Sequence, residues 1–300
     1  MFRSGMLLSI AASMLFALLA SYAGFLAPLD GAEMFAWRVI WTLPGAFLLI
    51  AMQRDWKALI TALHRLRGER RLWLAVPIAT SLLSVQLWLF LWAPANGHML
   101  DVSMGYFLLP ISTVLAGRFF LGERLGPIQW VASLLALGGV VHEIWSTATF
   151  SWISAVIMLG YPPYFMLRRW LNMNAVVGFM IEIALMLPVA AGILLHATGD
   201  GPVLPAHSPW LLLPGLGIVS AAAMGCYMAS SQTLPLGIFG MLGFIEPVLL
   251  FLVAVLFFDE KITVSALLTY GPIWAGVLLV LLHAALPKLP TQRFRSIWTS

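Results

Sequence analysis

The segment 107–140 recurs without gaps as the segment 244–277, which lies 137 residues further along the chain. The matched polar and turn-forming positions are Pro110 with Pro247, Glu123 with Glu260, Arg124 with Lys261, and Gly139 with Gly276. Both copies consist of a hydrophobic helix, a short acidic-basic hinge and a second hydrophobic helix. A duplicated apolar unit of this kind is typical of membrane transporters. The chain is therefore expected to fold as two related halves.

The composition identifies the solvent as the lipid bilayer. Hydrophobic residues make up 61% of the chain and charged residues only 9%, whereas a soluble domain carries roughly a quarter charged residues. This leaves no room for a separate soluble domain. The single cysteine, Cys226, excludes a disulfide framework or a cysteine-rich metal site. No nucleotide-binding loop, nucleophile elbow or zinc motif is present either, so we expect no enzyme activity, no cofactor and no metal.

Membrane-spanning helices need about 20 mostly apolar residues each. Runs of this kind predict ten spans, over residues 5–25, 33–52, 72–94, 103–120, 125–144, 151–168, 176–195, 210–231, 236–258 and 262–285. Only Leu121–Arg124 separates the fourth span from the fifth, and the second copy of the repeat has the same short break. The first run could be a signal peptide, but its apolar stretch exceeds the usual core of about 7–15 residues. An uncleaved helix is favoured.

The basic residues predict the orientation of these spans. With the N-terminus inside, only Lys261 of the 16 Lys and Arg residues falls on the outer side, and Arg38 lies within a span. This asymmetry indicates cytoplasmic N- and C-termini and an even number of spans. The net charge of +4 is thus explained by topology, and we expect no nucleic-acid partner.

Five spans in each repeat unit is an odd number, so the two units must face opposite ways across the membrane. The predicted fold is an all-α polytopic membrane protein of two inverted five-helix repeats, over residues 1–146 and 150–286. The segment 287–300 is a basic cytoplasmic tail expected to meet anionic lipid.

Charged residues at membrane depth are the main functional candidates, because an unpaired ion in hydrocarbon costs several kcal/mol. Arg38, Glu182 and Glu246 qualify. The glutamates are candidates for proton exchange or for binding a cationic group, and Arg38 for binding a carboxylate. The alternative is that they form buried ion pairs that lock helices together. Glu246 is also an acidic mismatch within the repeat, because Leu109 occupies the matching position in the first copy.

Prolines and glycines inside the spans predict bends. Pro110 and Pro247 each remove a backbone hydrogen bond, and Gly240 and Gly243 precede the second of them. The glycines can equally serve close helix packing. The pair Pro162–Pro163 is expected to break its helix in the same way.

Aromatic residues crowd the third span and the start of the fourth. Trp88 and Trp92 lie four residues apart near Gln86, and Tyr106 follows. These residues predict either an interfacial aromatic belt or an aromatic-lined pocket for a planar or amphipathic solute, with Gln86 as a polar contact.

These features together resemble the EamA family of the drug/metabolite transporter superfamily. Within it, the chain is similar to the RarD branch, the chloramphenicol-sensitive permeases. The segments that carry the resemblance are Glu33 with Trp37–Trp41, His98–Phe107, Gly122–Arg124, Gly178 with Ile181–Glu182 and Leu187–Pro188, Glu246–Val248, and Asp259–Lys261.

The resemblance implies a permease of the cell inner membrane that moves a small-molecule solute, with export the expected direction. Protons are the candidate coupling ion, the lipid bilayer is a further partner, and the oligomeric state is left open. Two alternatives stay open. One is an uncoupled facilitator or channel-like pore, and the other is a non-transporting membrane protein such as a signalling partner or an intramembrane enzyme.

Overall fold

The computed structural model describes residues 2–26, 29–96, 98–123, 126–147, 151–197, 212–246, 248–249 and 264–285. Within these ranges the regular elements are all helical. They are α1 (Phe2–Ala23), η1 (Gly24–Leu26), α2 (Gly31–Gln53), α3 (Trp56–Gly68), α4 (Leu72–Ala95), α5 (Met99–Phe120), α6 (Pro127–Thr147), α7 (Trp152–Leu171), α8 (Ala175–Ala197), α9 (Leu212–Thr233), α10 (Leu236–Leu242) and α12 (Val264–Ala285).

The all-helical prediction is confirmed for the described residues, and each predicted apolar run overlaps a described helix. By length and apolar composition, four of the described helices, α2, α4, α8 and α9, could cross a membrane. The run 236–258 begins as a short helix, because α10 ends at Leu242, next to the predicted bend candidate Gly243. One prediction about continuity is wrong. The pair Pro162–Pro163 does not break α7, which continues through both prolines to Leu171.

Local signals in the sequence explain where α2 begins. Asp30 is its N-cap, and its carboxylate accepts a hydrogen bond from the backbone N–H of Glu33 at 2.7 Å. The Glu33 carboxylate in turn accepts from the backbone N–H of Asp30 at 2.9 Å. This reciprocal capping box satisfies two otherwise unpaired donors of the helix terminus. Both acidic residues thus serve the helix end.

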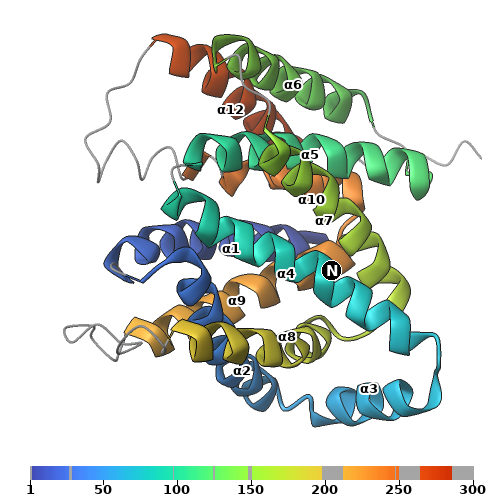
Figure 1. The fold of residues 1–300 in the computed structure, drawn as a ribbon. Coiled ribbons are helices and arrows are strands. Elements are labelled where there is room, and N and C mark those ends of the chain that lie inside the picture. Colours follow the sequence, from blue (N-terminus) through green and yellow to red (C-terminus); the bar gives the residue numbers. More distant parts are fainter. Residues whose placement is uncertain are drawn as a thin grey trace, which may run out of the picture.

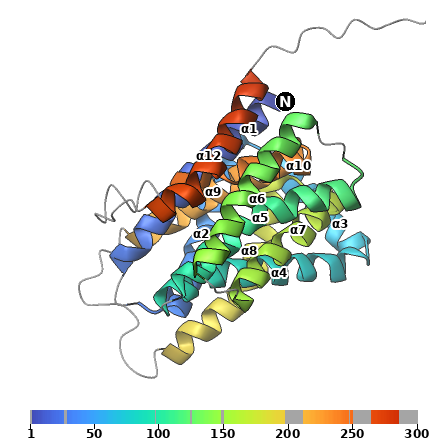
Figure 2. The ribbon, with the colours of Figure 1, turned by 90° about the horizontal axis from the view of Figure 1, so that it is seen from above.

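The helices form three groups, which are stacked from top to bottom in Figure 1, and Figure 2 looks onto this stack from above. α6 and α12 pack together at one end of the bundle, and α2, α8 and α9 pack together at the other. Between them lie α1, α4, α5, α7 and α10, with α5 in contact with both α7 and α10. The middle group therefore joins helices from the beginning and the end of the chain.

Helix boundaries follow the same spacing as the sequence repeat. α5 and α10 begin at residues 99 and 236, and α6 and α12 begin at residues 127 and 264, each pair 137 residues apart. α2 and α8 are each 23 residues long, and their first residues, Gly31 and Ala175, are 144 positions apart in the sequence. The related helices α2 and α8, α5 and α10, and α6 and α12 also contact each other directly.

Two glycines at matching positions hold α6 and α12 together. A Cβ atom on Gly139 would collide with the backbone oxygen of Thr269, and one on Gly276 would lie 2.8 Å from the backbone oxygen of Ala132. Positions 132 and 269 are themselves related by the 137-residue shift. The contact is therefore the same contact made twice, once from each helix.

The helix α3 lies outside the predicted spans and docks beside the turn between α7 and α8. Arg65 donates hydrogen bonds to the backbone oxygens of Leu171 and Asn172, at 3.2 Å and 3.0 Å. Asn174 of the turn donates to the carboxylate of Asp55 at 2.8 Å. The charge distribution assigns segments 54–71 and 168–174 to the same side of the membrane, and they lie side by side.

Glu69 follows α3 and ties it to the surrounding basic residues. Its carboxylate is 2.8 Å from Arg65 and 2.8 Å from Arg71. Hydrogen bonds from these two guanidinium groups lower the pKa of Glu69 from about 4.5 to about 2. The carboxylate therefore remains charged at any physiological pH.

Candidate functional site

A small central cavity lies among helices from both parts of the chain. Its volume, about 10 Å³ for the centres of water-sized spheres, fits about one water molecule. The lining residues come from α1, α2, α4, α5, α7, α9 and the segment just after α10. They are Phe16, Arg38, Leu87, Phe90, Tyr106, Tyr161, Tyr227 and Glu246.

Arg38 reaches this cavity from α2 and is only 2% exposed. Its Nε donates a hydrogen bond to the hydroxyl of Ser220 on α9 at 2.8 Å. Its guanidinium carbon lies 5.5 Å from the centre of the Phe90 ring, a distance at which the cation and the ring attract each other. The terminal nitrogen Nη1 has no hydrogen-bond partner. The buried guanidinium is thus held in place, and its Nη1 group remains available to donate a hydrogen bond.

Glu246 is the acidic member of the cavity and is 7% exposed. It lies four residues beyond α10, which ends with Gly243 as its C-cap. Neither Glu246 nor Arg38 belongs to an ion pair of the described residues. The cavity therefore contains a cationic and an anionic group that no other charged side chain of the described chain neutralises by direct contact.

The predicted bend residues Gly240 and Gly243 precede this acid in the chain and pack against α5. A Cβ on Gly240 would lie 2.9 Å from the backbone oxygen of Pro110, so α10 approaches α5 closely there. Gly243 marks the interruption of the helix, and α5 continues through Pro110 to Phe120. Pro247 lies outside the described residues. Interrupted helices with a charged residue at the break are typical of substrate sites in transporters.

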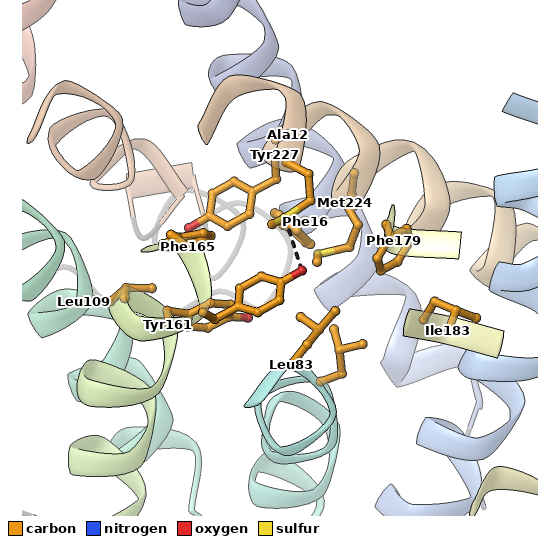
Figure 3. Packing of buried hydrophobic residues seen from close by; sticks show 14 of the residues in the cluster. Ala12, Phe16, Leu83, Leu109, Tyr161, Phe165, Phe179, Ile183, Met224 and Tyr227 are labelled. Atoms are coloured by element: carbon orange, nitrogen blue, oxygen red, sulfur yellow. Dashed lines mark hydrogen bonds between the residues drawn. The ribbon is translucent and has the colours of Figure 1, made fainter. Parts of the chain in front are cut away.

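Aromatic rings form one wall of the cavity and continue into the core behind it. The Tyr161 ring stacks on Phe165 with centroids 5.6 Å apart, and Tyr227 meets Phe165 at 5.5 Å and Phe16 at 5.5 Å (Figure 3). On the other side, Tyr106 meets the Phe90 ring edge-on at 5.8 Å. The wall is amphipathic because each tyrosine carries a hydroxyl group on an apolar ring.

Glu182 lies outside the cavity in a separate buried network. Its carboxylate is 3.6 Å from Nε of Arg168 on α7 and accepts a hydrogen bond from the Tyr164 hydroxyl at 2.8 Å. Arg168 also donates to the backbone oxygen of Ala175 at 2.9 Å. Any side chain at Gly178 would collide with the Arg168 guanidinium. The geometry matches the alternative of a structural ion pair, with Arg168 as the partner instead of Arg38.

The remaining aromatic and amide candidates are distributed over other contacts. Gln86 donates to the backbone oxygen of Val156 on α7 at 2.9 Å, and thereby joins α4 to α7. Trp88 lines a second cavity between α4 and α8. Trp92 stacks on Trp88 at 4.9 Å and on His98 at 6.0 Å, away from the central cavity. Of this group, only Tyr106 joins Arg38 and Glu246.

The Gly-Glu hinge of the first repeat copy has a defined structural role. Gly122 has φ +64, a conformation that favours glycine, and it turns the chain after α5. The Glu123 carboxylate then accepts hydrogen bonds from the backbone N–H groups of Leu236 and Gly237, at 2.6 Å and 2.7 Å. It also lies 3.4 Å from Arg169. One acidic residue therefore caps α10 and joins it to α7.

Sequence reasoning missed several residues of the two buried sites. They are Phe16, Tyr161, Tyr227, Ser220, Tyr164 and Arg168. Arg168 is 1% exposed, and the charge distribution gives only its side of the membrane. Its signal was the placement of an arginine on the helix that precedes Glu182, since a buried acid needs a basic partner nearby.

An all-helical bundle with several candidate spans and a buried, charged and aromatic cavity is the architecture of a membrane transporter. The sequence pattern of the EamA-like transporter family matches residues 3–142. A Pseudomonas aeruginosa protein named "Chloramphenicol-sensitive protein RarD" is 49% identical over 277 residues, covering 92% of each chain. The chain thus belongs to the EamA-like transporter family, whose members are multi-pass membrane transporters and not enzymes.

Further relatives and a solved structure agree with this assignment. An "Uncharacterized transporter" of Haemophilus influenzae is 38% identical over 95% of each chain. "Protein RarD" of Escherichia coli is 30% identical over 97% of this chain and 98% of its own length. A solved crystal structure matches the fold with a TM-score of 0.70 at 20% identity, covering 95% of this chain and 98% of that one. That likeness concerns the fold alone.

Proposed function

We propose that this protein is a secondary transporter of the cell inner membrane that moves a small amphipathic metabolite or drug-like solute by alternating access, in the export direction. The proposal rests on one observation. Arg38 and Glu246 line the same buried cavity, and neither forms an ion pair with a described residue. Buried charges are costly unless something compensates them. A solute with polar groups can supply that compensation during each cycle.

The architecture proposed for this cycle is ten spans in two inverted halves, 1–146 and 150–286, with both termini in the cytoplasm. The repeated helix boundaries and the reciprocal contacts of Gly139 and Gly276 support it. The cavity is lined by helices of both halves. Rocking one half against the other around such a site is the mechanism that inverted repeats favour.

The roles that we assign in the cavity follow from the contacts. Arg38 binds an acceptor group of the solute through its unpartnered Nη1. Glu246 binds a proton or the cationic part of the solute, which would make it the coupling residue. Tyr106, Tyr161 and Tyr227 provide the amphipathic wall. Glu182 is assigned to structure through Arg168.

Chloramphenicol is the first test solute, because the Pseudomonas aeruginosa relative is named for sensitivity to it. Inverted membrane vesicles containing the protein should accumulate labelled chloramphenicol, or another member of a metabolite and drug panel, when a proton gradient is imposed. Flux that ignores the gradient would favour the uncoupled facilitator. No flux for any member of the panel would favour a non-transporting protein.

Glu246→Gln should abolish gradient-driven accumulation and preserve insertion, because the amide keeps the shape of the side chain but cannot carry the proton. The measurement is solute accumulation with and without the gradient, at matched protein levels. Glu182→Gln is the matched control, and it should lower the amount of folded protein while leaving coupling intact in the protein that inserts. A Glu246→Gln protein that transports at the wild-type rate would end the assignment of coupling to this residue.

A further inference from the structure

A second cavity opens between α4, α8 and α2 and is much larger than the central one. Its volume is about 470 Å³ on the same measure, within the range of about 300–1,000 Å³ that is typical of ligand pockets. We call it the α4/α8 crevice. It is lined by Phe35, Pro77, Thr80, Ser81, Ser84, Val85, Trp88, Leu185, Met186, Val189 and Ile193.

The two walls of the crevice differ in chemistry. The α8 wall, from Leu185 to Ile193, is entirely apolar and about 12 Å long at 1.5 Å per residue. The α4 wall carries three hydroxyl groups, those of Thr80, Ser81 and Ser84, and ends at the indole of Trp88. These α4 residues lie in the middle of a helix that could cross the membrane. The crevice is therefore amphipathic at a depth where lipid offers only hydrocarbon.

Thr80 supplies the observation that points to a ligand. It is 8% exposed, and its Oγ1 has no hydrogen-bond partner. By contrast, the neighbouring Ser84 hydroxyl donates to the backbone oxygen of Ser81 at 3.0 Å. A buried hydroxyl without a partner is destabilising. The Oγ1 atom is itself covered by neighbouring atoms in this conformation, but Thr80 lines the crevice. A rotation about its χ1 angle would bring the hydroxyl to a ligand with one hydrogen-bonding group, which would remove that cost.

The crevice opens toward the bilayer. Val189 is 61% exposed, Leu185 46% and Val85 40%, and in a membrane such faces contact lipid. A molecule dissolved in the bilayer can reach the crevice sideways, without passing through the aqueous phase. The 12 Å wall is shorter than the roughly 15 Å of hydrocarbon in one leaflet. A compact amphipath fits this length better than a phospholipid chain.

We propose that the α4/α8 crevice binds a small amphipathic solute that enters from the bilayer, with its apolar body against Leu185–Ile193 and its polar group on the Thr80 hydroxyl. This inference deepens the proposed function. It rests on that function in one respect, because it takes the bound molecule to belong to the class of solutes that the protein transports. The crevice then acts as a collecting site for membrane-dissolved solute, apart from the central cavity of Arg38 and Glu246.

The test uses the full chain with Cys226→Ser in phosphatidylcholine vesicles and a single cysteine at Ser84→Cys. The reagent is 3-(trifluoromethyl)-3-(m-iodophenyl)diazirine, which dissolves in the bilayer and on illumination gives a carbene that labels the thiol without requiring a thiolate. The competitor is 1-naphthol, a planar apolar molecule with one hydroxyl group, and labelling at position 84 is read by peptide mass spectrometry. We expect 1-naphthol to slow the labelling at position 84 in a saturable way. Ala221→Cys is the matched control, since this buried residue occupies the position on α9 that corresponds to Ser84. It should resist labelling with or without competitor.

Thr80→Val, which keeps the shape and removes the hydroxyl, should weaken protection by 1-naphthol about threefold to tenfold, the loss expected for one neutral hydrogen bond. Thr80→Ser should retain it. Equal protection in wild-type and Thr80→Val proteins, or no protection at all, would overturn the proposal. So would labelling that is blocked in vesicles, free in detergent and insensitive to 1-naphthol, because a phospholipid chain would then be the occupant.

Protection from labelling measures binding and requires no transport. If no solute is transported but 1-naphthol still protects position 84, the proposed function fails and the binding site stands. If transport is intact and protection is absent, the inference about the crevice fails alone. Glu246→Gln should leave the protection unchanged, because Glu246 belongs to the central cavity.

Discussion

In the proposed pair of repeats, the crossing of α2 with α9 corresponds to the crossing of α8 with α4, yet one is sealed and the other is open. α4 and α9 match with the 137-residue shift, which places Pro77 on Pro214, and α2 and α8 match with a shift of 144, which places Pro44 on Pro188. Arg38 and Glu182 fall on equivalent positions in this alignment. The two crossings therefore share their backbone plan and differ in side chains.

Two glycines account for the sealed crossing. A Cβ on Gly217 would collide with the backbone of Trp41, and a Cβ on Gly45 would lie 3.0 Å from the backbone oxygen of Gly217. The equivalent positions in the open crossing are Thr80 and Val189, and both line the crevice. Small residues let helix backbones approach closely. The comparison teaches that side-chain volume at two positions decides which of two related interfaces closes.

Breaking the sealed crossing should have the largest effect. In Gly217→Val the new side chain would meet backbone atoms of Trp41, which cannot move aside as a side chain can. We expect a loss of about 3 kcal/mol of stability, the upper part of the usual range for over-packing. Thermal unfolding in detergent measures it. Thr80→Val at the equivalent position is the control and should cost less than about 1 kcal/mol; similar losses in both variants would remove the distinction between the crossings.

Sealing the open crossing is the next test. The double variant Thr80→Gly with Val189→Gly copies the glycine pair of the α2/α9 crossing. If side-chain volume keeps the crevice open, α4 and α8 should approach each other in this variant. The rate of labelling of Ser84→Cys should then fall about tenfold, which corresponds to about 1.4 kcal/mol in the free energy of opening the crevice. Unchanged labelling in a folded double variant would mean that loops or other helices hold these two helices apart.

Weakening the ion pairs of Glu69, which hold α3 beside α4 and α8, should have the smallest effect. α3 contacts both α4 and α8, and Glu69 anchors it through Arg65 and Arg71. Because the folded pKa of Glu69 is lowered to about 2, its contribution is complete above about pH 4.5 and is lost as the pH falls toward 2. The protection factors of α3 amides, which are corrected for the intrinsic exchange rate at each pH, should therefore fall across this interval. Glu69→Gln should abolish that change in protection, and protection factors that fall equally in both proteins would argue against this role of Glu69.

The sequence predicts the helices well because apolar length is a property of each segment by itself. It predicts α3 poorly, since a helix that lies outside the spans has no long apolar run. The interruption at Gly243 is predicted only as one of two alternatives. Glycines indicate either bending or packing, and the choice depends on the approach of α10 to Pro110. Such contacts are decided by other helices.

The functional site is predictable in its charges and less so in its surroundings. Arg38 and Glu246 stand out because ions are rare at membrane depth, and the structure brings both to one cavity with Tyr106. Tyr161 and Tyr227 carry no such signal, because a tyrosine is ordinary in a span. Their role depends on which helices meet, and that information lies in tertiary packing.

The ion pair of Arg168 with Glu182 has a consequence for the way the chain enters the membrane. α8 is among the helices that are apolar enough to insert alone, but it would carry a lone carboxylate into hydrocarbon. An unpaired carboxylate there costs several kcal/mol, and α7 carries Arg168, the partner that can neutralise it, in its last turn. A short turn joins the two helices, so the charges can meet as soon as both have been synthesised. We therefore expect α7 and α8 to enter the membrane together as a hairpin, in which each helix supplies the charge that neutralises the other.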